Sequence, residues 1–128
     1  MKIFTSFIFS IFLLTNISAQ EIVEVNFLGN STIQDLSISP LLFGFLKNGV
    51  DSYELIYTTT DLQGNTVEVS GLMVIPDTDA RYPMLCYQHG TVDNPTAVPS
   101  NPGTGDATLA QLWGGLGYIS FSPDLLGL

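Results

Sequence analysis

Basic residues are scarce in this 128-residue chain, which has three Lys and Arg against twelve Asp and Glu and a formal net charge of −9. Nucleic-acid binding needs clustered Lys and Arg that displace counterions from the phosphates. Anionic membrane surfaces also attract basic rather than acidic segments. The composition therefore argues against a nucleic-acid partner and disfavours anionic lipid surfaces, but it leaves an uncharged substrate open.

Cysteine and histidine each occur once, as Cys86 and His89. A single cysteine cannot close an internal disulfide. A catalytic dyad of Cys86 and His89 is disfavoured because residues three apart on a strand point to opposite faces. A metal site made by His89, Asp93 and Asp106 has no ligand spacing typical of metal-binding motifs. We expect neither a metal nor a cofactor.

The sequence also lacks Gly-x-Ser-x-Gly, the pentapeptide that presents a nucleophilic serine on a sharp strand-to-helix turn. Ser120 and Ser122 could approach His89 if their strands are neighbours, but neither serine sits in such a turn sequence. With one histidine there is also no second imidazole to act as a general base. We therefore predict no catalytic residue in this chain.

The longest apolar run lies within the first nineteen residues. Lys2 precedes an apolar stretch from Ile3 to Leu14, and Ala19 ends a short segment typical of a signal-peptide cleavage site. The apolar stretch is shorter than the ~20 residues needed to span a bilayer. The pattern predicts a signal peptide over residues 1–19. The mature chain would then be secreted or periplasmic, without a stable membrane anchor, and loss of Lys2 would change its net charge from −9 to −10.

Residues 53–75 show the pattern of an antiparallel hairpin. Aromatic and β-branched residues alternate over 53–60, a loop follows over 61–65, and a return strand is expected over 67–75. The preceding residues, 20–49, are less regular and are treated as an N-terminal extension. Within that extension Val23, Val25 and Phe27 alternate like a short strand.

The second half of the chain predicts a strand, a helix and a strand. Residues 84–87 form an apolar run without alternation, typical of a parallel strand covered on both faces. Prolines exclude a helix until Thr104 or Asp106 can cap one. The expected helix over 106–116 would precede a strand over 118–122, as in a right-handed parallel βαβ unit. Its buried residues should be Leu109, Leu112, Trp113 and Leu116.

Taken together, several ordered segments resemble the N-terminal third of secreted α/β-hydrolases, and secretory lipases and related esterases are most similar. The resemblance lies in residues 50–61, 64–66, 69–76, 88–91 (Gln-His-Gly-Thr) and 117–128 (Gly-Tyr-Ile-Ser-Phe-Ser-Pro-Asp-Leu-Leu-Gly-Leu). It implies that residues 50–128 form the first, incomplete part of an α/β-hydrolase sheet. In that sheet the strand at 118–122 would lie between those at 67–75 and 84–87.

The same resemblance implies hydrolysis of acyl esters or lipids by the parent enzyme, with backbone N–H groups of Gly90 and Thr91 forming an oxyanion hole. His89 and Asp124 would be structural, because the family's catalytic histidine lies near the end of a full-length chain and Asp124 matches a turn motif. The nucleophile, acid and base would follow Leu128. The chain is accordingly expected to be an N-terminal fragment that is inactive alone.

Three alternatives stay open at this point. The chain could be a secreted binding module without enzymatic activity, which a β-rich structure without a crossover helix would favour. It could be a degenerate copy, in which case no catalytic segments would follow it in the genomic DNA. Within enzymes, a peptidase on the same fold would share these segments.

Overall fold

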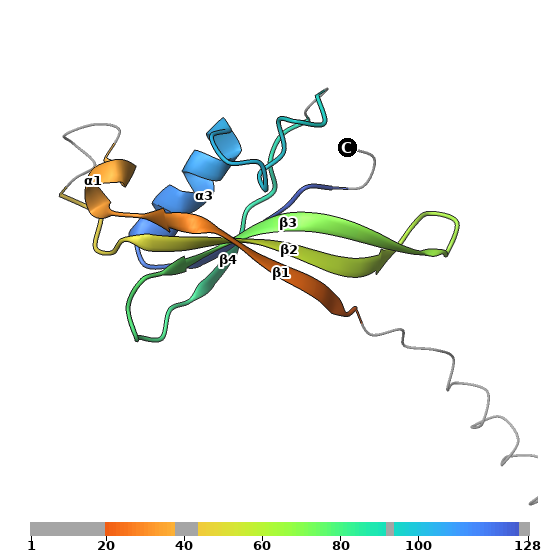
Figure 1. Ribbon diagram of the computed structural model, residues 1–128, viewed down its shortest axis with the longest axis horizontal. Helices are drawn as coiled ribbons and strands as arrows, with labels where there is room; N and C mark the ends of the chain where they lie inside the picture. Colours follow the sequence, from red (N-terminus) through yellow and green to blue (C-terminus); the bar gives the residue numbers. More distant parts are fainter. Residues whose placement is uncertain (1–19, 38–43, 92–93, 126–128) are drawn as a thin grey trace, which may run out of the picture.

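The computed structural model describes residues 20–37, 44–91 and 94–125, which form one five-stranded sheet with the strand order β1-β2-β3-β5-β4. Figure 1 shows both helices on one side of this sheet. The predicted signal peptide lies outside the described residues, and no helix within them is long and apolar enough to cross a membrane. The elements are β1 (Ile22–Ser31), α1 (Ile33–Leu36), β2 (Val50–Thr60), β3 (Thr66–Pro76), β4 (Met84–Cys86), α3 (Gly105–Gly115) and β5 (Ile119–Pro123).

The predicted hairpin is formed by β2 and β3, which pair without a register shift from Val50 opposite Pro76 to Thr60 opposite Thr66. The side chain of Asp61 closes the turn, because its Oδ1 accepts from the backbone N–H of Gln63 at 2.9 Å and of Asn65 at 2.7 Å. An Asp side chain that accepts from the backbone two residues on stabilises a turn. The loop over 61–65 thus joins the two strands as expected.

The crossover unit is also confirmed. β4 and β5 are parallel neighbours joined through α3, and β5 lies between β3 and β4. This order is the predicted one and makes the fold class an incomplete α/β sheet. The described part of the chain leaves β4 as an edge strand with Met84 and Cys86 exposed, so it is not covered on both faces as its apolar run suggested.

β1 is longer than the short strand indicated by Val23, Val25 and Phe27. It pairs antiparallel with β2 from Ile22 to Ser31, with two register shifts. Residues 22–31 therefore belong to the same sheet as residues 50–60. The chain then enters α1, where Thr32 and Asp35 cap each other's backbone. The hydrogen bonds from the Thr32 side chain and backbone lower the pKa of the Asp35 carboxyl.

Helix α3 packs on the sheet through its smallest side chains, which corrects the buried face predicted from the sequence. The expected residues Leu109, Leu112, Trp113 and Leu116 are only partly buried. Leu112 and Leu116 pack at the margin of the core, and the Trp113 ring meets that of Tyr118 edge-on with centroids 6.0 Å apart. The buried residues of the helix are instead Ala107, Ala110, Gly114 and Gly115.

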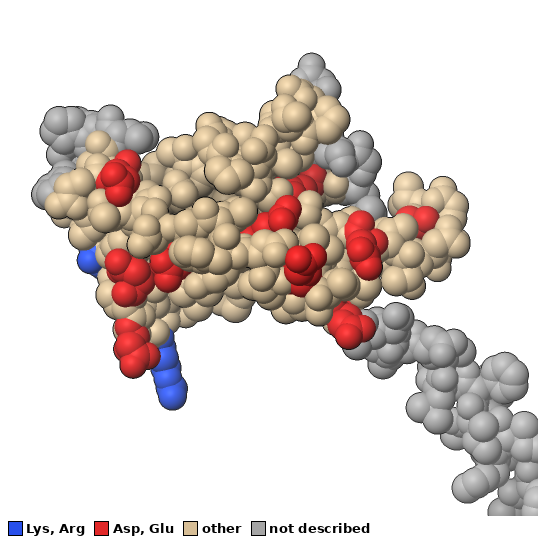
Figure 2. All heavy atoms as spheres, viewed as in Figure 1, with Lys and Arg blue, Asp and Glu red and all other residues tan. Residues whose placement is uncertain are grey.

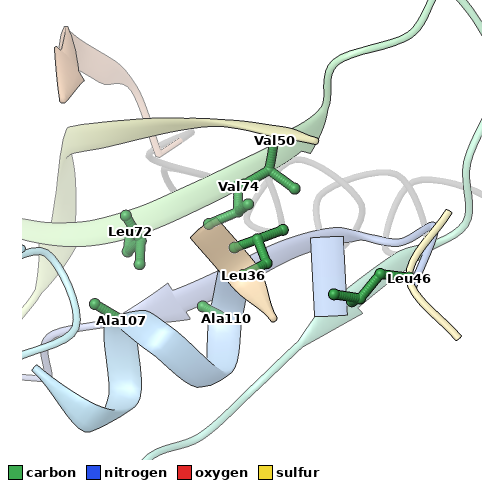
Figure 3. Close-up of a cluster of buried hydrophobic side chains, with 7 residues drawn as sticks. All are labelled: Leu36, Leu46, Val50, Leu72, Val74, Ala107 and Ala110. Carbon is green, nitrogen blue, oxygen red and sulfur yellow. The ribbon is translucent and has the colours of Figure 1, made fainter. Parts of the chain in front are cut away.

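Gly114 explains why the small face is the buried one. A Cβ on Gly114 would lie 2.7 Å from Val74 Cγ1 and 2.8 Å from Val50 Cγ1. Because β-branched side chains on strands have few alternative rotamers, they cannot easily withdraw. The absence of a side chain at Gly114 therefore permits the close approach. Figure 3 shows the resulting cluster of Leu36, Leu46, Val50, Leu72, Val74, Ala107 and Ala110.

Acidic side chains are scattered over the surface seen in Figure 2, and the few basic ones lie at one end. Lys47 and Arg81 are the basic residues within the described ranges. The described surface therefore carries the acidic character expected from the composition.

Replacing Gly114 with alanine should destabilise the protein by about 1–3 kcal/mol, because the added methyl overpacks the contact with Val50 and Val74. Gly105→Ala is the matched control, since a Cβ there meets no atom within 4 Å. Denaturant unfolding should show the loss for Gly114→Ala alone. Equal stability of both variants would contradict the close packing of α3.

Candidate functional site

The segment His89-Gly90-Thr91 leaves the carboxyl end of β4 from a point held firmly to β5. The backbone N–H of Tyr87 donates to the Phe121 carbonyl at 2.8 Å. The hydroxyl of Ser122 donates to the Tyr87 carbonyl at 3.0 Å. Both backbone polar groups of Tyr87, its N–H and its carbonyl, are therefore hydrogen-bonded to β5.

His89 is buried, and its ring contacts its own loop. The imidazole Nδ1 lies 2.7 Å from the Gly90 carbonyl oxygen, so we assign the ring proton to Nδ1 as the donor of this bond. The other ring nitrogen, Nε2, is buried without a hydrogen-bond partner among the described residues. The buried imidazole is thus hydrogen-bonded to the backbone of its own loop.

Gly90 and Thr91, the proposed oxyanion donors, are both exposed. The φ angle of Gly90 is not in the left-handed region, and a Cβ built on it would meet no atom within 4 Å. Neither the backbone conformation nor the packing of this structure therefore requires glycine at position 90. The space beside the loop backbone is open.

The alternative partners of His89 are not bonded to it. β4 and β5 are neighbours, as a contact with Ser120 or Ser122 would require, but Ser122 donates to a backbone carbonyl and Ser120 Oγ has no partner among the described residues. Cys86 is exposed, and its sulfur lies 3.3 Å from Gln88 Nε2. The described residues thus show no nucleophile paired with this imidazole.

The metal alternative is not supported by the described residues either. Asp93 lies outside them, and within them no three His, Cys, Asp or Glu side chains are grouped so that they could hold a metal ion. Asp106 instead accepts a hydrogen bond from the Tyr87 hydroxyl at 3.1 Å, which joins the first turn of α3 to the end of β4.

Asp124 is a buried carboxylate that joins three parts of the chain. Its Oδ1 accepts from the Ser100 backbone N–H at 2.9 Å, and its Oδ2 accepts from the Ser70 hydroxyl at 2.6 Å and from the Ser100 hydroxyl. Its own N–H donates to the Ser70 carbonyl at 3.0 Å. One side chain therefore holds the loop before α3 against β3 and the end of β5.

The residue after this carboxylate has an unusual backbone. Leu125 has a φ of 62°, in the left-handed region, which costs a non-glycine residue roughly 1–2 kcal/mol. The hydrogen bonds of Asp124 hold the preceding residue in place and offset such a cost. Sequence reasoning found Asp124 but missed Ser70 and Ser100, because two isolated serines 30 positions apart carry no motif or spacing that would mark them.

Burial raises the pKa of two tyrosines in this region. The pKa of Tyr87 is raised by desolvation and further by its hydrogen bond with Asp106 and that carboxylate's charge. The pKa of Tyr57 is raised by burial and by the nearby charges of Asp124 and Cys86. Both phenols therefore stay neutral to a higher pH than an exposed tyrosine.

A cleft of about 210 Å³ opens on the helix side of the sheet, between β1 and α3. Ser52, Ser100 and Gln111 contribute polar groups to it, and Leu28 and Leu72 contribute apolar ones. The Gln111 side chain donates to the Ser52 hydroxyl at 3.3 Å. Because His89, Gly90 and Thr91 do not line this cleft, it is separate from the loop at the end of β4.

The structure is similar to those of known hydrolases. A candidate hydrolase from Legionella pneumophila matches with a TM-score of 0.75 and 27% identity, over 84% of this chain and 31% of that one. A variant of the rice cell wall degrading esterase LipA from Xanthomonas oryzae matches with a TM-score of 0.69 and 25% identity, over 84% and 29%. The chain has the fold of an incomplete hydrolase sheet.

This chain spans less than a third of the length of either matched protein. No protein-family model matches the sequence, and a search of curated protein sequences found no match. The similarity to hydrolases therefore comes from the fold together with the 25–27% identity of these two structures.

Replacing Asp124 with asparagine should lower the free energy of unfolding by about 1–3 kcal/mol, because a buried hydroxyl or amide would lose its acceptor. Asp79→Asn is the control, since Asp79 is exposed in the loop between β3 and β4. Limited proteolysis should also cleave the loop over 94–104 faster in the Asp124 variant. Unchanged stability and cleavage would show that the carboxylate does not hold this loop.

The raised tyrosine pKa values predict a loss of stability at alkaline pH. Because the folded state favours the neutral phenols, their contribution is fully present below the unfolded pKa of about 10 and is lost as pH rises through the folded pKa. The free energy of unfolding should therefore be lower when measured above that pH than when measured below it. A Tyr57→Phe, Tyr87→Phe double variant should show a smaller fall, and an identical pH profile would refute the assignment.

Proposed function

We propose that residues 50–128 supply the oxyanion-hole side of a secreted serine hydrolase domain that acts on acyl esters. The observation that carries the proposal is the His89-Gly90-Thr91 loop at the carboxyl end of β4, in which Gly90 and Thr91 are exposed, within a crossover unit similar in structure to an esterase. Ligands of open α/β sheets bind at the carboxyl ends of the strands. The loop thus stands where a substrate would be held.

In this proposal, the backbone N–H groups of Gly90 and Thr91 donate to the oxyanion that forms when a serine attacks the ester carbonyl. Donors fixed in advance stabilise such charge because they need not reorganise during the reaction. Glycine at position 90 leaves room for a substrate beside the backbone, which accounts for a residue that the fold does not otherwise require. The bond from His89 to the Gly90 carbonyl sets the orientation of the loop.

The substrate we propose is a small uncharged acyl ester or lipid. The acidic surface disfavours nucleic acids and other polyanions, whereas it does not repel a neutral ester. The nucleophile, the acid and the base would come from polypeptide that follows residue 128. Residues 1–19 would direct export and be removed by cleavage after Ala19, so the reaction would take place outside the cytoplasm.

A secreted binding module is the second candidate, and the crossover helix weighs against it. A β-rich structure without such a helix would favour a binding module, whereas α3 joins two parallel strands here. The hydrolase proposal accounts for the helix, the parallel pair and the exposed loop together.

The 128-residue chain by itself should not hydrolyse short-chain aryl esters above background, because the catalytic groups of a triad act as a unit. Turnover of p-nitrophenyl esters is measured with and without a serine-directed phosphonate. The prediction is contradicted if the phosphonate inhibits the turnover and one Ser→Ala substitution abolishes it.

The coding sequence beyond Leu128 should contain Gly-x-Ser-x-Gly followed by an acid and a histidine. In a polypeptide extended through these segments, Thr91→Pro removes one donor N–H and should lower kcat by about 10²–10³-fold with little change in KM. Thr91→Ala keeps that N–H and should retain most activity. Equal losses of kcat in both variants would argue against a role for the Thr91 backbone N–H. Contiguous DNA that encodes no such serine motif, acid and histidine would favour a degenerate copy.

A further inference from the structure

The hydrogen-bond ladder between β4 and β5 lacks one backbone donor at its end. Bonds between parallel strands are evenly spaced, so every second residue of β5 presents its N–H to β4. Ile119 donates in this way to the Pro83 carbonyl at 2.9 Å, and the Phe121 carbonyl accepts from the Tyr87 N–H at 2.8 Å. At the same register, the next N–H would come from residue 123 and would reach the Tyr87 carbonyl.

Residue 123 is a proline, which has no N–H to donate. The Tyr87 carbonyl therefore has no ladder partner on β5. The hydroxyl of Ser122 takes this place, because it donates to that carbonyl at 3.0 Å. Ser122 is 0% exposed, so no solvent competes for its hydroxyl. One buried side chain thus replaces the missing backbone bond.

Ser120 shows that burial alone does not give a serine this role. It lies two positions earlier on β5, so its side chain points to the same face of the sheet, and it is also 0% exposed. Its Oγ, however, has no hydrogen-bond partner among the described residues. The residue that follows Ser120 is Phe121, which has an N–H to donate. The two serines therefore differ in whether the ladder beside them is complete.

Tyr87 is held at a third point by its side chain. Its hydroxyl donates to Asp106 Oδ1 at 3.1 Å, in the first turn of α3. Its N–H, carbonyl and phenol thus join this one residue twice to β5 and once to α3. β4 ends at Cys86, and residues 87–91 belong to no strand. Tyr87 is therefore the fixed point from which the loop leaves the sheet.

We propose that Ser122 is a positioning residue for the proposed oxyanion loop, residues 89–91, an inference that rests on the function proposed above. The bond to the Tyr87 carbonyl prevents rotation of the peptide plane between Tyr87 and Gln88. That plane sets the direction in which Gly90 and Thr91 present their N–H groups. Because donors aligned in advance stabilise an oxyanion best, loss of the bond should slow the chemical step more than it weakens substrate binding.

The first measurement is nuclear magnetic resonance relaxation of the isotope-labelled 128-residue chain. In Ser122→Ala, the backbone order parameters of Gly90 and Thr91 should fall from about 0.8 to below about 0.6, because the loop loses its anchor. Ser122→Cys keeps nearly the same shape but is only a weak donor, so it should loosen the loop as alanine does. Ser122→Thr keeps the hydroxyl and should keep the loop rigid. Ser120→Ala is the matched control and should change nothing.

The second measurement is ester hydrolysis by the polypeptide extended beyond residue 128. Ser122→Ala should lower kcat by about 10–100-fold with little change in KM, since a small misplacement of a catalytic group has an effect of this size. Ser122→Thr should retain most activity, and Ser120→Ala should retain all of it. Circular dichroism checks that every variant is folded. If threonine does not fit the buried site, the comparison of alanine, cysteine and serine at position 122 decides.

The outcomes separate this inference from the function on which it rests. If Thr91→Pro lowers kcat but Ser122→Ala is as active and as rigid as Ser120→Ala, the role of Ser122 is wrong and the hydrolase proposal stands. If Thr91→Pro leaves kcat unchanged, the proposed function fails, and the catalytic role of Ser122 fails with it. A rise in KM at unchanged kcat in Ser122→Ala would also overturn the inference, because the bond would then serve binding.

Discussion

The close approach of α3 to the hairpin is the contact on which the rest of the described structure depends. Gly114 lets the helix lie directly on Val50 and Val74, at separations that a side chain would not permit. This contact seats the crossover between β4 and β5. Consequently it also places Asp106 at the first turn of α3 within reach of the Tyr87 hydroxyl.

Side-chain hydrogen bonds position the loops that the contact between α3 and the hairpin does not hold. The loop before α3 contains several prolines and has no strand or helix of its own, so side-chain hydrogen bonds must hold it. Asp124 does this by accepting from Ser70 and Ser100. The backbone around His89 is held separately by β5 and by its own imidazole. The proposed oxyanion loop and the Asp124 cluster therefore rest on the same strand, β5.

The two faces of the sheet differ in chemistry because only one of them is matched to a helix. Against the small face of α3 the sheet presents branched aliphatic side chains and buried serines. The other face presents mainly aromatic and aliphatic residues, several of them exposed. A sheet of this kind is stable in water only when its apolar face is covered. The hydrolase proposal concerns what completes this half-covered sheet.

Local patterns in the sequence determined the hairpin, the edges of the crossover unit and the place of the His89-Gly90-Thr91 segment after β4. Alternation over residues 53–60 and turn chemistry at Asp61 act over a few positions, so they can be recognised without the fold. The resemblance to α/β-hydrolases added the strand order, in which β5 lies between β3 and β4. The comparisons with solved structures agree with that fold.

Only the tertiary structure decided which side of α3 is buried and what surrounds Asp124. Helical periodicity favoured the large residues around Leu112, but the space over Val50 and Val74 leaves no room for a Cβ at Gly114, and the other buried residues of the helix are also glycine and alanine. The partners of Asp124 lie 24 and 54 positions away, and the strand formed by residues 22–31 depends on pairing with β2. Sequence periodicity reports how polar a position is, whereas close packing and distant hydrogen bonds depend on which segments meet.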